Sequence, residues 1–175
     1  MIRLSSWKTT GAVFLLCTAM AIASPGQTFK TLASFDGANG GANPSSIVQG
    51  INRDFYGTTY DRGANGFGTV FRITSGGKLA TLYAFCPQND CSQGSTPSAG
   101  LVLATDANFY GTTQSGGTYG AGTVFKITAG GALTTLYSFC QVSNCPDGLR
   151  PSGALVQGSD RNFYGITDLA SAPSS

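Results

Sequence analysis

The sequence contains no histidine and no glutamate, so every acidic side chain is an aspartate. A Ser-His-Asp or Cys-His catalytic arrangement is therefore excluded, and acid–base catalysis would depend on Asp, Lys or Tyr. Charged residues make up only 10% of the chain. These absences favour a non-catalytic protein without a cofactor. One enzyme class stays open as an alternative, a glycoside-cleaving enzyme that uses paired aspartates such as Asp106 and Asp160.

Long hydrophobic runs are absent except near the N-terminus. Arg3 and Lys8 precede an apolar run, residues 11–23, which ends in small residues before Ser24 and Pro25. This pattern is typical of a signal peptide that spans residues 1–23, and the run is shorter than the roughly 20 residues of a membrane span. We therefore expect a secreted or cell-surface protein with no stable membrane span after cleavage.

A basic excess is also absent from the predicted exported form. Without residues 1–23 the chain carries eight Lys and Arg against eight Asp, so it is neutral. Binding to nucleic acid depends on basic side chains that neutralise phosphates. We therefore expect no nucleic-acid partner. Helical periodicity is missing as well beyond the leader, which predicts an all-β class.

The sequence instead contains a tandem repeat. The segment GTVFRITSGGKLATLYAFC at 68–86 returns as GTVFKITAGGALTTLYSFC at 122–140. A second phrase, FYGTT or FYGIT, begins at Phe55, Phe109 and Phe163. Its three copies are equally spaced, with the same spacing as the two copies of the longer segment. The recurring positions that we single out as repeat-motif residues are Phe55, Tyr56, Gly57, Gly68, Phe71, Phe109, Tyr110, Gly111, Gly122, Phe125, Phe163, Tyr164 and Gly165.

Each repeat holds four strand candidates. The first strand candidate in the chain is 29–35, which matches the later TLYAF and TLYSF strands. Short inner strands are predicted at 46–48, 100–103 and 154–156, followed by the FYG strand, the GTVF strand and an outer TLYxF strand. Four strands in about 54 residues are close to the 40 to 50 residues of a propeller blade. We expect a β-propeller-like tandem repeat of four-stranded antiparallel blades.

The strand count gives roughly 2.75 repeats, so the array is expected to be incomplete or open. We assign one domain to residues 24–168, with repeat units at about 29–85, 86–139 and, in part, 140–168. Residues 169–175 are low in complexity and are expected to form a disordered tail.

Asx-rich tripeptides separate the inner and FYG strands, at 52–54, 106–108 and 160–162. Asn and Asp tolerate left-handed backbone and bond their own backbone two residues on, which predicts tight hairpin turns. A calcium loop is an open alternative, although no bidentate Glu follows. The Gly-rich segments 60–68 and 114–122 lack the Gly-Lys-Ser/Thr ending of a phosphate-binding loop.

Four cysteines fall at the same places in two repeats, with Cys86 near Cys91 and Cys140 near Cys145. In an exported protein this spacing predicts two local disulfides that brace the loops between blades. A zinc site is the open alternative, disfavoured because no histidine is available.

Tyrosines recur at 56, 110 and 164 and at 83 and 137. Exposed aromatic rings stack on sugars, but regular repetition on strands favours packing between blades.

The order of FYGTT, a Gly-rich loop, GTVFxIT, GG, LTTLYSF and a Pro-containing loop resembles the GloVer-type tandem repeat of choice-of-anchor bacterial surface proteins. The resemblance covers most of residues 29–168. It implies an exported repeat protein of a family whose biochemical role is uncharacterised.

The function predicted is an exported, non-catalytic β-repeat module that is structural or binds a ligand at or outside the cell surface. The candidate partner is a carbohydrate or a cell-surface polymer. Self-association through unpaired strand edges, in a self-assembling subunit or a part of a larger propeller array, is a further alternative.

Overall fold

The computed structural model describes residues 29–38 and 40–169. The predicted signal peptide and residues 170–175 lie outside this range. The architecture below is that of the described residues from 31 onward, which belong to one compact unit.

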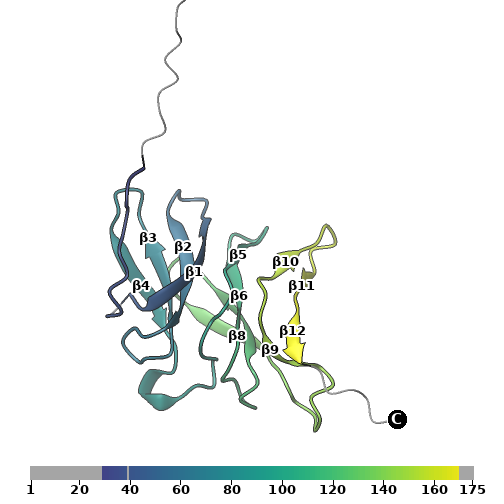
Figure 1. The fold of residues 1–175 in the computed structure, drawn as a ribbon. Coiled ribbons are helices and arrows are strands. Elements are labelled where there is room, and N and C mark those ends of the chain that lie inside the picture. Colours follow the sequence, from purple (N-terminus) through teal and green to yellow (C-terminus); the bar gives the residue numbers. More distant parts are fainter. Residues whose placement is uncertain (1–28, 39, 170–175) are drawn as a thin grey trace, which may run out of the picture. The chain divides into compact units, whose positions relative to one another are not determined.

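The first blade is an antiparallel sheet of four strands in sequence order (Figure 1). Its strands are β1 (Ala42–Gln49), β2 (Phe55–Asp61), β3 (Thr69–Ile73) and β4 (Leu79–Ala84). The β1–β2 turn places Arg53 in the left-handed region at φ 68°, and the β3–β4 turn does the same with Gly77 at φ 90°. Both tripeptides thus form the predicted hairpin turns, but the left-handed residue of the Asx turn is Arg53, and Asn52 contributes by accepting a hydrogen bond from the Asp54 N–H at 3.3 Å.

The second blade repeats this arrangement. After a short 3-10 helix, η1 (Pro87–Asn89), its strands are β5 (Val102–Leu103), β6 (Phe109–Thr113), β7 (Thr123–Ile127) and β8 (Leu133–Ser138), again in sequence order. The register is also repeated, since Gly57 pairs with Phe71 in the first blade and Gly111 pairs with Phe125 in the second. The fold is therefore all-β, with propeller-like, four-stranded antiparallel blades.

The third blade contains the inner two strands in the described residues, each in two pieces (Figure 1). Strand β10 (Val156–Gln157) pairs with β11 (Phe163–Tyr164), and β9 (Leu149–Pro151) pairs with β12 (Thr167–Leu169). Leu169, which we placed in the tail, pairs with Leu149 and ends strand β12.

Neighbouring blades pack face to face through aromatic rings. Tyr56 of the first blade stacks on Phe109 of the second, with ring centroids 4.2 Å apart, and Phe85 meets Phe125 edge to face at 5.5 Å. Tyr110 stacks on Phe163 of the third blade at 4.2 Å. The hydrophobic core consists of Tyr56, Val70, Phe85, Leu101, Phe109, Phe125 and Ile127. The core therefore lies between the first two blades and draws on both.

Backbone hydrogen bonds between blades follow the same period. The Thr96 N–H donates to the Phe67 carbonyl at 2.9 Å, and the Arg150 N–H donates to the Ala121 carbonyl at 2.8 Å. Thr58 donates its hydroxyl proton to the Ala99 carbonyl at 2.8 Å. The first two contacts join matching positions of consecutive repeats, and the third satisfies a buried carbonyl, so together they fix the spacing of the blades.

Two strand predictions are wrong in their extent. Residues 29–35 form no strand, since none of the strands in the described residues pairs with them. Phe35 still packs against Phe71, with centroids 4.7 Å apart. The inner strands also differ from their predicted bounds, since β1 begins at Ala42 with a bulge between Pro44 and Ile47. Strand β9 lies in one of the two segments between blades that we expected to be loops braced by disulfides.

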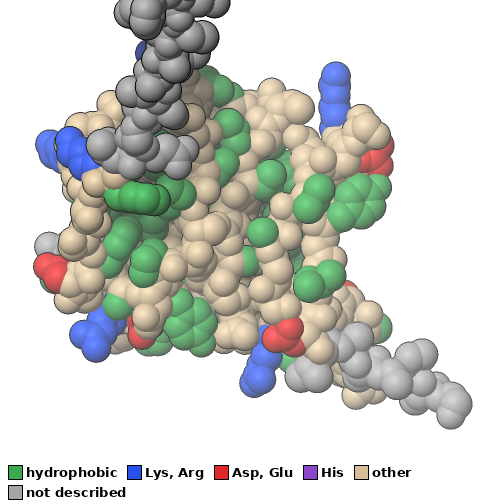
Figure 2. Space-filling view, turned by 45° about the horizontal axis from the view of Figure 1, so that its top comes forward, with side chains coloured by type: hydrophobic (Ala, Val, Ile, Leu, Met, Phe, Trp, Pro, Cys, Tyr) green, Lys and Arg blue, Asp and Glu red, His purple; other side chains and the backbone are tan. Residues whose placement is uncertain are grey.

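Charged side chains are sparse on the surface and lie mainly at the margins of the face in Figure 2. Within the described ranges, no helix has the length and apolar character needed to cross a membrane.

Candidate functional site

A shallow groove of about 610 Å³ runs along β8, the edge strand of the second blade. Besides β8, it is lined by Thr118 and Tyr119 from the loop before β7 and by Ser92, Gln93 and Gln141 from the two loops that contain the cysteines. Hydroxyl, amide and aromatic groups thus converge beside one exposed strand. This combination recognises ligands that carry both apolar faces and hydroxyl groups.

Tyr119 is the most distinctive side chain of the groove. Its side chain is 51% exposed, and among the tyrosines that the structure describes it alone has neither a hydrogen bond nor a ring contact. At the matching position of the first blade stands Asn65, whose amide donates to the carbonyls of Ala84 and Phe85 at 3.2 and 3.0 Å. The second blade has therefore exchanged a structural amide for a free aromatic ring.

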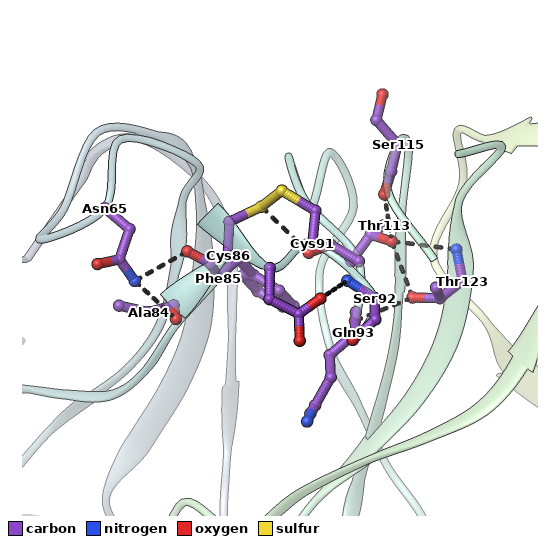
Figure 3. Close-up of a disulfide and its surroundings, with 12 residues drawn as sticks. Asn65, Ala84, Phe85, Cys86, Cys91, Ser92, Gln93, Thr113, Ser115 and Thr123 are labelled. Carbon is purple, nitrogen blue, oxygen red and sulfur yellow. Dashed lines mark hydrogen bonds between the residues drawn. A yellow bond between two sulfur atoms is a disulfide. The ribbon is translucent and has the colours of Figure 1, made fainter. Parts of the chain in front are cut away.

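The loops that supply the amides are braced by disulfides. The structure pairs Cys86 with Cys91 and Cys140 with Cys145, with 4.1 Å between the Cα atoms in each pair, which is the pairing that the spacing predicts. Figure 3 shows Ser92 and Gln93 directly after the first bridge. The bridges therefore restrict the positions of the groove's Gln93 and, on the other loop, Gln141.

Hydrogen bonds also hold the Gln93 backbone in place. The hydroxyls of Thr113 and Thr123 lie 2.8 Å apart, and Thr123 reaches the Gln93 carbonyl at 3.4 Å (Figure 3). The Thr135 hydroxyl, which also lines the groove, is buried without a hydrogen-bond partner in the described part of the chain. The groove thus combines a fixed backbone with an unsatisfied polar group on its strand.

Tyr137 forms another wall of the groove, and its hydroxyl is held from the far side. It donates to Asp147 Oδ2 at 2.7 Å, and the Cys140 N–H donates to the same oxygen at 2.9 Å. The hydrogen bond from Tyr137 lowers the pKa of Asp147, and the same bond raises the pKa of Tyr137. Asp147 therefore orients the ring and is fixed as a carboxylate.

The residues that the sequence repeats lie elsewhere. Tyr56 and Phe109 pack between blades, and Gly57 and Gly111 leave room for the rings of Phe71 and Phe125, whose Cζ atoms would lie 2.6 and 2.7 Å from an added Cβ. Gly68 and Gly122 have left-handed φ values of 87° and 100°. The repeat-motif residues are distributed along the blades by their period and do not converge on one site.

The Asx turns use their carboxylates internally. Asp106 accepts hydrogen bonds from Asn108 and Tyr110, and Asp160 accepts them from Asn162 and Tyr164. The Asn108 side chain lowers the pKa of Asp106, and the Tyr164 hydroxyl lowers that of Asp160. A glycosidase general acid needs a raised pKa, the opposite direction.

In the part of the chain that the structure describes, no group of three or more His, Cys, Asp or Glu side chains is placed to hold a metal ion.

The sequence matches a known protein family over nearly its whole length. The model of the Gloeobacter/Verrucomicrobia repeat matches residues 7–174. The chain belongs to this family. No curated protein matches the sequence.

Among solved structures, the chain is similar to a protein provisionally assigned as a gluconolactonase. The two are 15% identical, with a TM-score of 0.46, and the match covers 76% of this chain and 44% of the other. The Gloeobacter/Verrucomicrobia repeat protein described here thus spans less than half of that structure.

The sequence reasoning missed Tyr119, Gln93 and Gln141. It weighed the tyrosines that recur, whereas Tyr119 occurs at a position where the first repeat has Asn65. The available signal was this departure from the repeat, because a position that loses its structural residue in the second blade is free for another role there.

Proposed function

We propose that this repeat protein is an exported, non-catalytic module that binds a carbohydrate or a sugar-containing cell-surface polymer in the groove along β8. The observation that carries the proposal is Tyr119, a half-exposed ring without a partner in the described residues, beside the amides of Gln93 and Gln141. Sugar rings present apolar C–H faces to aromatic rings and hydroxyls to amides.

The edge position of β8 supports a polymer as the ligand. An edge strand with side chains pointing outward presents an elongated surface, and the groove is open along it. The neutral charge of residues 24–175 favours an uncharged glycan over a polyanion. The ligand class that these features support is therefore a neutral oligosaccharide or polysaccharide.

Export is part of the proposal. The charged start and apolar run of residues 1–23 support a signal peptide, and the two disulfides suit an oxidising compartment. The mass of the protein recovered from outside the producing cell tests this point. A chain that begins at Ser24 and lacks four hydrogens is expected, and an intracellular chain that retains Met1 with free thiols would contradict export.

Binding is tested by affinity electrophoresis in gels that contain a panel of neutral polysaccharides. The unmodified protein is expected to be retarded by at least one of them. Tyr119→Ala is expected to lose up to about 10-fold in affinity, since stacking of one aromatic ring contributes about 0.5 to 1.5 kcal/mol. Tyr60→Ala is the matched control, because Tyr60 is also exposed but lies outside the groove. Equal retardation of both variants would exclude the groove as the site.

A further inference from the structure

A second hollow, of about 370 Å³, lies between the second blade and the described part of the third. Its lining includes Val124 and Phe139 of the second blade and Leu155, Phe163 and Gly165 of the third. Their repeat counterparts are, in the same order, Val70, Phe85, Leu101, Phe109 and Gly111. The first four belong to the core cluster that contains Phe125, and Gly111 faces the Phe125 ring. The hollow therefore has the walls of a phenylalanine site.

The glycines of the two sites show the same geometry. A Cβ added at Gly111 would lie 2.7 Å from Cζ of Phe125 and 2.9 Å from Cδ2 of Leu101. A Cβ added at Gly165 would lie 2.8 Å from Cδ2 of Leu155, the repeat counterpart of Leu101. The missing side chain of Gly165 thus leaves the same space that the Phe125 ring occupies over Gly111.

The backbone beside the hollow also has a free edge. Strands β2 and β6 are each paired on both sides, with β1 and β3 or with β5 and β7. Their counterparts β11 and β12 are paired on one side only among the described residues, with β10 and β9. The N–H and C=O groups of such an edge form a template for another strand.

Charge at the third blade matches a basic strand. In the first blade Arg72 of β3 forms an ion pair with Asp54 of the turn, with 3.1 Å between Nε and Oδ2. In the second, the pKa of Asp106 is lowered by the hydrogen bond from Asn108 and also by the positive charge of Lys126 on β7. Asp160 has the same place in the third blade, and within residues 29–38 and 40–169 it forms no ion pair.

We propose that the third blade binds an extended polypeptide strand of the form Gly-Thr-Val-Phe-basic-Ile-Thr, antiparallel to β11 and β12. The phenylalanine enters the hollow over Gly165, and the basic residue lies near Asp160. The register is that of β7 on β6, where Phe125 pairs with Gly111 and Lys126 with Tyr110. The site is a protein-recognition site with a different ligand from that of the groove along β8, and the linings of the two hollows share only Tyr137.

The test uses a fluorescent peptide with the sequence of residues 122–128, titrated with the purified protein and followed by anisotropy. Saturable binding is expected. A peptide with alanine in place of phenylalanine is expected to bind at least about 100-fold more weakly, as the loss of a buried Phe side chain implies. A peptide with glutamate in place of lysine is expected to bind about 3-fold more weakly.

Two glycine variants of the protein separate the hollow from the fold. Gly165→Ala places a methyl group where the ring enters and is expected to weaken binding at least about 10-fold. Gly130→Ala is the matched control, because an added Cβ there meets only Thr128 Oγ1, at 3.8 Å. Circular dichroism confirms that each variant is folded, and amide exchange along residues 163–169 is expected to slow when the peptide binds.

Equal affinity of the phenylalanine and alanine peptides would overturn the proposal, as would absence of saturable binding at millimolar concentration. A homodimer that persists in excess peptide would also overturn it, because a second copy would then cover this face in another way. A homodimer that dissociates as the peptide binds would support it, since the copies and the peptide would compete for one strand site.

Discussion

Replacing Phe109 by alanine tests whether burial between blades provides the stability of this array. The Phe109 side chain is 1% exposed, and its ring lies 4.2 Å from that of Tyr56 in the preceding blade. Truncation of a buried phenylalanine removes its transfer free energy and leaves a cavity, at a cost of about 3 to 5 kcal/mol. With about 2 to 4 °C per kcal/mol for a chain of this size, the melting temperature should fall by roughly 12 °C.

Phe163 offers a matched control in the third blade. It stacks on Tyr110 at the same 4.2 Å, but its side chain is only partly buried. Phe163→Ala should therefore cost about half as much, about 2 kcal/mol. Urea unfolding followed by circular dichroism and by tyrosine fluorescence measures both variants. A loss for Phe163→Ala that equals or exceeds that for Phe109→Ala would refute the assignment of stability to the interface of the first two blades.

Three further predictions concern the bridges, the turns and a glycine. The double variant Cys140→Ser, Cys145→Ser should lose about 2 kcal/mol of unfolding free energy in urea, since so short a loop restricts the unfolded chain only modestly; an unchanged midpoint would contradict this. The pKa values of Asp106 and Asp160 are lowered in the folded protein, so their ionised forms stabilise the fold above the ordinary aspartate pKa of about 4, and this stability is lost as the pH falls through the lower folded values. The melting temperature should therefore be level from about pH 7 to 5 and fall below about pH 4. A melting temperature that stays level down to about pH 2 would argue against the hydrogen bonds of the turns. Gly68→Ala should destabilise far more than Gly66→Ala in the same urea assay, because both have φ near 87° but an added Cβ meets the Thr59 carbonyl and, at 2.8 Å, Pro97 only at Gly68.

The blades were predictable from the sequence because their local signals agree with one another. The Gly-Gly turns place glycine at positive φ, and in the Asx turns the first Asn or Asp accepts a hydrogen bond from the N–H two residues on. The alternation of Thr, Phe and Ile on the GTVF strands defines a register. Gly57 opposite Phe71 and Gly111 opposite Phe125 follow from the same pattern. The constant period then transfers each assignment from one repeat to the next.

Other features were beyond local reasoning. Strand β9 contains a positive φ of 54° at Arg150, and the matching Thr96 has a φ of 50°. Neither arginine nor threonine favours a positive φ, so the residue types do not predict these values. The N–H groups of both residues bond to a carbonyl of the preceding blade, Ala121 or Phe67, so the conformation is set by a contact that is distant in sequence. Residues 29–35 fail as a strand for a related reason, since strand formation needs a partner as well as a suitable sequence.

The division between repeated and unrepeated residues explains where recognition is to be sought. Tyr56 and Phe109 belong to the repeated phrase because each blade must pack against the next one. A residue that is buried in this packing has no exposed surface with which to bind a ligand. Tyr119 replaces Asn65, an amide that holds two carbonyls in the first blade, and so gives up a structural role for an exposed ring. Ile166 likewise stands where Thr58 bonds the next blade through its hydroxyl, a bond that isoleucine cannot make. In an array whose packing residues recur once in every repeat, the departures from the repeat mark the surfaces released from packing, and both proposed binding sites include such a departure.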